Sequence, residues 1–198
     1  MSIYHKWKTI FIQIPRNASQ AIHGRLRNRT DDRLIWGTFF DIMHENDPEL
    51  FETYFSFACV RNPYERLISA YEAECTTTGS PPWGLKFEDF VERIYDEGTM
   101  FYVNYPNHYV PQYKFITIKD MLLVDEIIRY ENINEDWKRI AKFINNQTKF
   151  SHVADKLEMI NVNNWRVNKT WEDYYNEDTK RKVYELYHKD FELFGYEK

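Results

Sequence analysis

Two short stretches of the sequence place an arginine between an apolar run and a segment with helical spacing. Residues 14–20 read IPRNASQ, and residues 60–69 read VRNPYERLIS. The first N–H groups of a helix lack intrahelical partners and lie at the positive end of the helix dipole, so these junctions favour anions. Arginine adds a fixed charge and a forked donor for phosphate or sulfate. The pair therefore suits a ligand with an anionic group at each end.

In the first stretch, the backbone N–H groups of Asn17 to Gln20 are candidates to surround a phosphate or sulfate, beside the Ser19 hydroxyl and the charge of Arg16. The alternative is an ordinary strand–turn–helix in which Asn17 or Ser19 is the N-cap. The stretch lacks glycine, whose conformational freedom phosphate loops usually need. The Walker pattern G-x-x-x-x-G-K-[ST] is also absent, which argues against an ATP- or GTP-type P-loop enzyme.

In the second stretch, Arg61 leaves the end of a predicted strand and a helix follows. Asn62, Arg66 and Ser69 share one helical stripe by their spacing, opposite the apolar residues. A guanidinium and a hydroxyl on this stripe could bind a second phosphate. The alternative is that Arg66 pairs with a nearby acid and that Ser69 has no special role.

These junctions sit in a chain whose strands and helices alternate. Strand patterns lie at Lys8–Ile14, within Trp36–Met43, at Tyr54–Val60 and at Glu126–Tyr130. Helices are predicted at Ser19–Arg27, from Pro48, from Pro63, at Lys86–Asp96, Asn134–Ile144 and Thr179–Phe191, with a loop at Thr76–Gly84. The pattern predicts an α/β fold with a central, mostly parallel sheet flanked by helices, with ligands at the carboxyl ends of the strands. A length of 198 residues suits a single domain, residues 1–198.

The composition limits the classes of partner that the protein could bind. The net charge of −5 argues against nucleic acid, so any phosphate site must be a local basic cluster. Two cysteines and no zinc-type Cys/His spacing predict no metal site. No apolar run reaches the roughly 18 residues of a membrane span, and the first residues do not read as a signal peptide. We therefore expect a cytoplasmic or soluble protein without a membrane partner, either of bacterial or viral origin or a trimmed catalytic domain; nothing indicates an oligomeric state.

Four segments together resemble a known family. IPRNAS, FACVRNPYERLISAY, VDEIIRYENINEDW and YHKDFELFGY are similar to segments of the sulfotransferases that use 3′-phosphoadenosine 5′-phosphosulfate (PAPS). The second segment is the most specific match. The likeness is closest to the branch that modifies carbohydrates such as heparan, chondroitin and the HNK-1 epitope.

The resemblance implies a P-loop-like three-layer fold and transfer of a sulfuryl group from PAPS to a hydroxyl, on a glycan, without a metal. It implies that Arg61 and Ser69 bind the 3′-phosphate. The 5′-phosphosulfate would lie against Arg16, Asn17, Ala18, Ser19, Gln20 and Ala21. Lys169 and Arg166 are candidates to close over the nucleotide from a basic loop; the alternative is an ordinary solvated loop. The chain departs from the family pattern at Arg16, where lysine is usual, and at Gln20 and Ala21, where hydroxyl residues are usual.

Transfer also needs a base for the acceptor's proton, and histidine is a common choice. His44 is the first candidate, because a histidine base lies in the matching segment of related enzymes, and His108 is the second, in an H-x-x-P-Q pattern. The alternative for His44 is a surface histidine near a helix start. Two other functions stay open, a different P-loop-like transferase such as a kinase and a non-catalytic nucleotide-binding relative.

Overall fold

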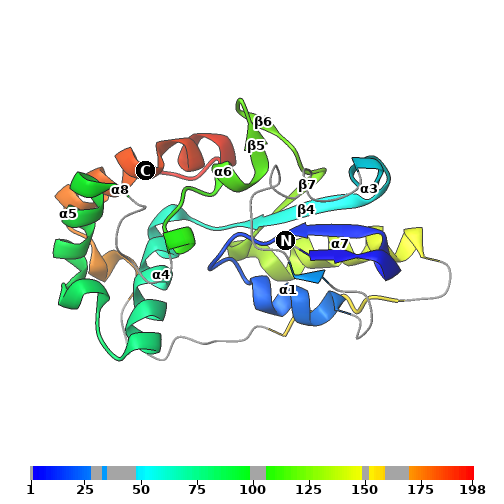
Figure 1. Cartoon of the computed structure of the whole chain (residues 1–198), viewed down its shortest axis with the longest axis horizontal. Helices are drawn as coiled ribbons and strands as arrows, with labels where there is room; N and C mark the ends of the chain where they lie inside the picture. Colours follow the sequence, from blue (N-terminus) through cyan, green and yellow to red (C-terminus); the bar gives the residue numbers. More distant parts are fainter. Residues whose placement is uncertain (1, 28–32, 35–47, 99–105, 149–151, 159–169) are drawn as a thin grey trace. The chain divides into compact units, whose positions relative to one another are not determined.

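A computed structural model describes residues 2–27, 33–34, 48–98, 106–148, 152–158 and 170–198 (Figure 1). The chain forms two compact units, one of residues 1–60 and 112–160 and the other of residues 61–111 and 161–198. The predicted strand within 36–43, together with His44, Arg166 and Lys169, lies outside the described residues.

The first unit is built on a five-stranded sheet in the order β3-β1-β2-β4-β7. Its strands are β1 (Ser2–Tyr4), β2 (Thr9–Ile12), β3 (Arg33–Leu34), β4 (Phe55–Val60) and β7 (Glu126–Arg129). β2 and β4 pair in parallel, as do β4 and β7, which confirms the predicted mostly parallel sheet.

Strand β1 differs from the predicted pattern because it runs antiparallel to β2. Its connection is only the 3-10 turn η1 (His5–Trp7) and Lys8, whose φ is 46°. A connection this short joins antiparallel neighbours, whereas a parallel pair needs a crossover. The sequence pattern did not predict β1, because the strand has only three residues and a turn with His5 and Lys6 follows it directly.

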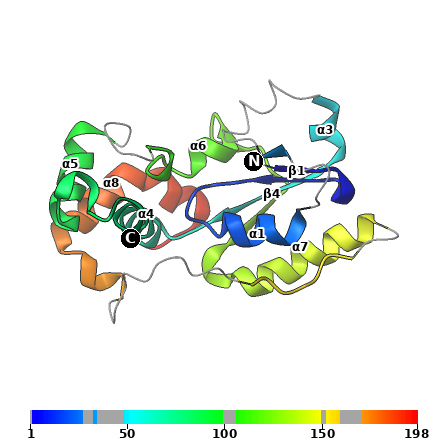
Figure 2. The same ribbon diagram turned by 60° about the horizontal axis from the view of Figure 1, so that its bottom comes forward.

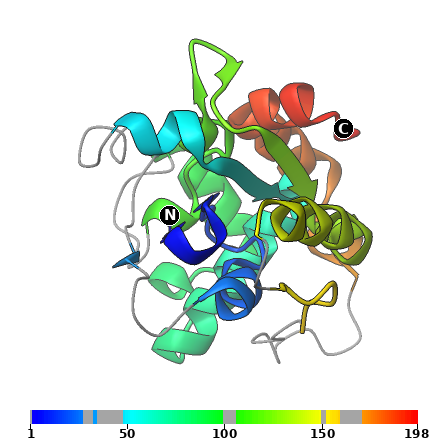
Figure 3. The same ribbon diagram turned by 90° about the vertical axis from the view of Figure 1, so that its right-hand side faces the viewer.

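Helices α1 (Ser19–Leu26) and α7 (Ile133–Gln147) cover one face of the sheet, as the end-on view shows (Figure 3). Ile22 and Leu26 of α1 and Trp137 and Ile140 of α7 share one buried cluster with Phe57 of β4. Helix α3 (Pro48–Thr53) and the β5–β6 hairpin lie on the other side of the sheet. The sheet is therefore flanked by helices, as the alternating pattern predicted.

The rest of the first unit consists of short elements. Helix α6 (Tyr113–Ile116) leads into β5 (Thr117–Ile118) and β6 (Met121–Leu122), and η4 (Tyr130–Asn132) precedes α7. Lys119 and Asp120 at the hairpin turn have φ values of 48° and 63°. Two left-handed residues in succession give the turn whose twist matches a two-stranded hairpin.

The second unit is helical. It contains α4 (Pro63–Thr78), η2 (Pro82–Gly84), α5 (Phe87–Glu97), η3 (Pro106–His108), η5 (Glu172–Tyr174) and α8 (Glu177–Phe194). Helix α8 packs against both α4 and α5 (Figure 2). Helix α4 begins as predicted: the Asn62 side chain accepts a bond from the Tyr64 N–H at 2.9 Å, and Pro63 occupies the first turn.

The predicted loop at 76–84 begins too early, because α4 continues to Thr78. The hydroxyls of Thr76, Thr77 and Thr78 each donate to the carbonyl four residues back. These bonds satisfy hydroxyls that would otherwise compete with the helix. Gly79 then ends the helix in a left-handed conformation, with a φ of 74°.

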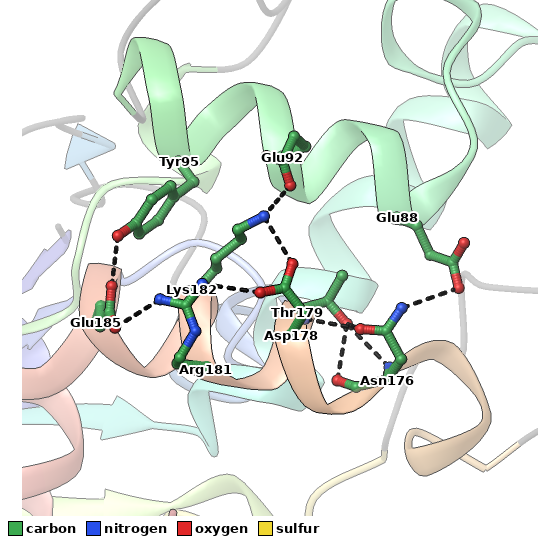
Figure 4. Close-up of polar contacts among 9 residues, drawn as sticks. All are labelled: Glu88, Glu92, Tyr95, Asn176, Asp178, Thr179, Arg181, Lys182 and Glu185. Atoms are coloured by element: carbon green, nitrogen blue, oxygen red, sulfur yellow. Dashed lines mark hydrogen bonds and ion pairs between the residues drawn. The ribbon is translucent and has the colours of Figure 1, made fainter.

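A network of charged side chains joins α5 to α8 (Figure 4). The Lys182 ammonium bonds Glu92 of α5 and, at 2.7 Å, Asp178 of its own helix. Arg181 bonds Asp178 and Glu185, each at 2.8 Å. The Tyr95 hydroxyl of α5 donates to Glu185 at 2.5 Å.

This network predicts an acid-sensitive contribution to stability. Hydrogen bonds from Lys182 and Arg181 lower the pKa of Asp178 below its ordinary 3.8, and bonds from Tyr95 and Arg181 lower the pKa of Glu185 below 4.5. The stabilisation is complete above the ordinary values and is lost as pH falls through the lowered ones. We expect thermal unfolding to show the wild type more stable than an Asp178→Asn, Glu185→Gln double variant at neutral pH. The difference should shrink below about pH 4; a difference that does not change with pH would contradict this.

Candidate functional site

The loop after β2 adopts left-handed backbone without glycine. Arg16 has a φ of 72° and Ala18 a φ of 55°. This conformation costs a residue other than glycine about 1–2 kcal/mol. Such strain tends to persist at ligand sites, where the surrounding structure holds it in place. Arg16 and Ala18 thus adopt the left-handed backbone conformation that glycine usually provides in phosphate loops.

Asn17 holds this strained loop in place from its middle. Its side chain is fully buried, and Nδ2 donates to the Cys59 carbonyl at 2.8 Å and to Gln112 Oε1 at 2.7 Å. Asn17 therefore ties the loop after β2 to the penultimate residue of β4 and to the segment before α6. The amide points into the fold, so Asn17 is not the N-cap of α1.

The N-terminus of α1 has no side-chain cap. Ala18 is the N-cap residue, and the Ser19 hydroxyl donates instead to the Ile14 carbonyl at 2.9 Å. The first intrahelical bond of this turn runs from the Ile22 N–H to the Ala18 carbonyl. The N–H groups of Ser19, Gln20 and Ala21 therefore have no intrahelical partner, which is the arrangement that binds anions.

The side chains of the loop divide by burial. Those of Asn17 and Ala21 are buried, those of Arg16, Ala18 and Ser19 are partly exposed, and that of Gln20 is exposed. What the loop can offer a ligand is therefore mainly backbone N–H groups and the Arg16 guanidinium.

The second junction begins one residue after β4. Arg61 is 7% exposed, and its Nη2 donates to Glu65 Oε2 at 2.8 Å. Glu65 lies on the first turn of α4, and Ser69 follows one turn later with 3% exposure. The sequence pattern did not single out Glu65, although its i, i+4 spacing from Arg61 is the signal that would have found it.

The Arg66 guanidinium is bonded to a backbone carbonyl of the second unit. Its Nη1 donates to the Val110 carbonyl at 2.9 Å, and only 2% of the residue is exposed. Burial lowers the pKa of Arg66, against the attraction of Tyr187 and Asp190. Asn62 caps α4. Two members of the predicted stripe, Asn62 and Arg66, thus bond different parts of the second unit.

His108 ends the 3-10 turn η3 in the second unit and is partly exposed. The next residue, Tyr109, is fully buried, and its hydroxyl donates to Glu74 at 2.8 Å. Gln112 of the same H-x-x-P-Q pattern is the partner of Asn17. The pattern thus carries a candidate base at one end and a contact of the first loop at the other.

The sequence model of the Sulfotransferase family matches residues 5–197, which includes both junctions. The chain belongs to the Sulfotransferase family. Membership implies a transferase that moves a sulfuryl group. No curated protein and no solved structure matches the sequence significantly.

The described residues contain neither a metal-binding cluster nor a membrane-spanning helix. Within them, no group of three or more His, Cys, Asp or Glu side chains is placed to hold a metal ion. Across the same part of the chain, no helix has the length and apolar character to cross a bilayer.

The left-handed residue at the N-cap of α1 predicts an unusual effect of glycine. Ala18→Gly should raise the free energy of unfolding by about 0.5–1 kcal/mol, because glycine adopts this conformation without steric cost. The matched control is Ala73→Gly within α4, which should lower it by about 1 kcal/mol. Urea unfolding checks both; a loss of stability in Ala18→Gly equal to that of the control would show that the loop is unstrained.

Proposed function

We propose that this chain transfers a sulfuryl group from PAPS to the hydroxyl of a carbohydrate, in a P-loop-like single domain. One observation carries the proposal. An uncapped, strained loop follows β2, an arginine-bearing helix start follows β4, and these two strands are parallel neighbours in a chain of the Sulfotransferase family.

The loop after β2 supports the binding of the 5′-phosphosulfate. Three N–H groups at the start of α1 offer donors at the positive end of the helix dipole, and Arg16, two residues before the N-cap, adds a fixed charge. A phosphosulfate is shorter than a triphosphate, so a short loop can contact it without surrounding a long phosphate chain. The departures at Gln20 and Ala21 leave this task to the backbone.

The start of α4 supports the binding of the 3′-phosphate by Arg61 and Ser69. Arg61 already holds a carboxylate, that of Glu65, so its fork is oriented for an anion. A 3′-phosphate must displace or share this partner. In the proposal, Lys169 then contributes a third cation from the polar segment before η5.

Sulfuryl transfer requires the attacking and leaving oxygens to be in line with sulfur. The acceptor oxygen forms a bond to sulfur as the bond from sulfur to the bridging phosphate oxygen breaks. The leaving group is adenosine 3′,5′-bisphosphate. Arg16 and the N–H groups of α1 stabilise the charge on the leaving oxygen. His44 or His108 takes the acceptor's proton.

Ligand preference tests the nucleotide site. We expect adenosine 3′,5′-bisphosphate to raise the midpoint of thermal unfolding at lower concentration than ATP, because binding to the folded state stabilises it by mass action. Arg61→Met should weaken bisphosphate binding by roughly 10- to 100-fold. The control is Arg139→Met on α7, whose side chain is 48% exposed, which removes the same charge elsewhere. A preference for ATP would reject the sulfotransferase assignment in favour of a kinase-like protein.

Transfer itself is measured with radiolabelled PAPS over a panel of glycans. Replacement of the base, by His44→Ala or His108→Ala, should lower the rate by roughly 10²- to 10⁴-fold. Full rates in both variants would reject a histidine base. Binding of the bisphosphate without transfer to any glycan would favour the non-catalytic relative.

Removing the carboxylate partner of Arg61 should have the opposite effect on bisphosphate affinity from removing Arg61 itself. The Glu65 carboxylate competes with a 3′-phosphate for the same guanidinium. We expect Glu65→Gln to tighten adenosine 3′,5′-bisphosphate by roughly three- to tenfold. Adenosine 5′-phosphate, which lacks the 3′ group, should bind both proteins alike. Weaker binding of the bisphosphate would instead mean that Glu65 holds Arg61 in its binding orientation.

A further inference from the structure

Two successive backbone carbonyls just after His108 each accept a hydrogen bond from a buried side chain. The Tyr187 hydroxyl of α8 donates to the Tyr109 carbonyl at 2.8 Å. Arg66 Nη1 of α4 donates to the Val110 carbonyl at 2.9 Å. Arg66 and Tyr187 are each 2% exposed. A connecting segment rarely receives two buried side-chain donors in a row, because most loops run over the surface and bond to water.

The side chain between these carbonyls is fixed as well. Tyr109 is fully buried, its ring packs on Phe90 of α5 with centroids 5.3 Å apart, and its hydroxyl donates to Glu74 of α4. Burial and the nearby Glu74 carboxylate raise the pKa of Tyr109, so its hydroxyl stays protonated and remains a donor. Pro111 follows and restricts the backbone further. All three long helices of the second unit therefore hold this segment.

Helix α8 departs from regular geometry at one of the donors. Tyr187 has a φ of −115° and a ψ of 18°, which lies outside the helical region. This part of φ/ψ space is sparsely populated and is found at strained or functional positions. The departure occurs at the residue whose hydroxyl reaches the Tyr109 carbonyl.

The surroundings of Arg66 point the same way. Asp190 of α8 is fully buried and attracts the guanidinium, which keeps the charge inside the unit. One donor of Arg66, Nη1, is bonded to the Val110 carbonyl, and only 2% of the residue is exposed, so the guanidinium is directed into the second unit. By contrast Arg61, at the helix start, pairs with a carboxylate, and it is the arginine proposed to bind the 3′-phosphate.

We propose that Arg66 and Tyr187 are positioning residues that fix the backbone carrying His108 and thereby aim its imidazole, and that Arg66 is not a ligand of the 3′-phosphate. The part that Arg66 and Tyr187 play in sulfate transfer rests on the proposed function, with His108 as the base. That they fix the backbone beside His108 does not depend on the proposed function.

The test compares Tyr187→Phe and Arg66→Met with a matched control. Tyr187→Phe removes only the hydroxyl that bonds the Tyr109 carbonyl, and it serves alone should Arg66→Met fail to fold. Tyr71→Phe is the control, because the buried Tyr71 of α4 likewise donates to a backbone carbonyl, that of Leu85, at 2.9 Å. Three quantities are measured: the histidine ring signals in ¹⁵N NMR, with His108 assigned by His108→Gln; the affinity for adenosine 3′,5′-bisphosphate and for adenosine 5′-phosphate; and the rate of sulfate transfer.

We expect both variants to shift the His108 ring signals while the control leaves them in place. Bisphosphate affinity should stay within about threefold of the wild type, and the transfer rate should fall by roughly tenfold or more, because small misplacements of a reacting group are costly. Unmoved His108 signals in the variants, or a transfer rate equal to that of the control, would overturn the proposal. So would a loss of bisphosphate affinity in Arg66→Met that adenosine 5′-phosphate does not share.

Failure of the proposed function gives a different result. A wild type that neither binds the bisphosphate nor transfers sulfate rejects the sulfotransferase site. The NMR comparison still decides whether Arg66 and Tyr187 fix the backbone beside His108.

Discussion

The parallel pairing of β2 with β4 is the constraint on which the candidate site depends. It sets Ile12 opposite Ala58 and so brings the carboxyl ends of both strands to one edge of the sheet. The buried amide of Asn17 secures this edge, because it bonds the Cys59 carbonyl near the end of β4 and the side chain of Gln112. A buried polar group with two partners fixes geometry well, since losing either bond leaves a group unsatisfied in the interior.

The same amide explains how the loop does without glycine. Arg16 and Ala18 flank Asn17, and both are left-handed. The anchored side chain between them holds the backbone in a conformation that neither neighbour would choose alone. Ala18, at the N-cap position of α1, has no polar side chain, so the first N–H groups of the helix have no side-chain cap.

Sequence patterns predicted most of the sheet and the helices because their signals are local. Alternating or continuous apolar runs identified β2, β4 and β7, and the Asn62–Pro63 pair identified the start of α4. Strand β1 and the β5–β6 hairpin were missed because they are short and their turns use lysine, histidine and aspartate instead of glycine. The extension of α4 through three threonines depends on bonds to the helix's own carbonyls, which propensity alone does not reveal.

Side-chain direction was the part of the candidate site that spacing could not determine. The sequence left Asn17 open as the N-cap of α1, whereas its amide lies in the interior, and it put Arg66 on one stripe with Ser69. Helical spacing says which residues share a face, but it does not say whether that face meets solvent or another helix. Here the packing of α8 against α4 decides, and it turns Arg66 inward to a backbone carbonyl.

The three arginines of the two junctions show how one type of side chain is used in different surroundings. Arg16 is partly exposed on a strained loop, Arg61 is buried against a carboxylate, and Arg66 is buried against a carbonyl and near Asp190. A guanidinium remains charged in all three settings, and at Arg61 and Arg66 it donates to the acceptor beside it. Lysine would lose part of its charge when buried and cannot present two parallel donors. Under the proposals above, the same type of side chain serves as an anion ligand at Arg16 and Arg61 and as a support for the backbone at Arg66.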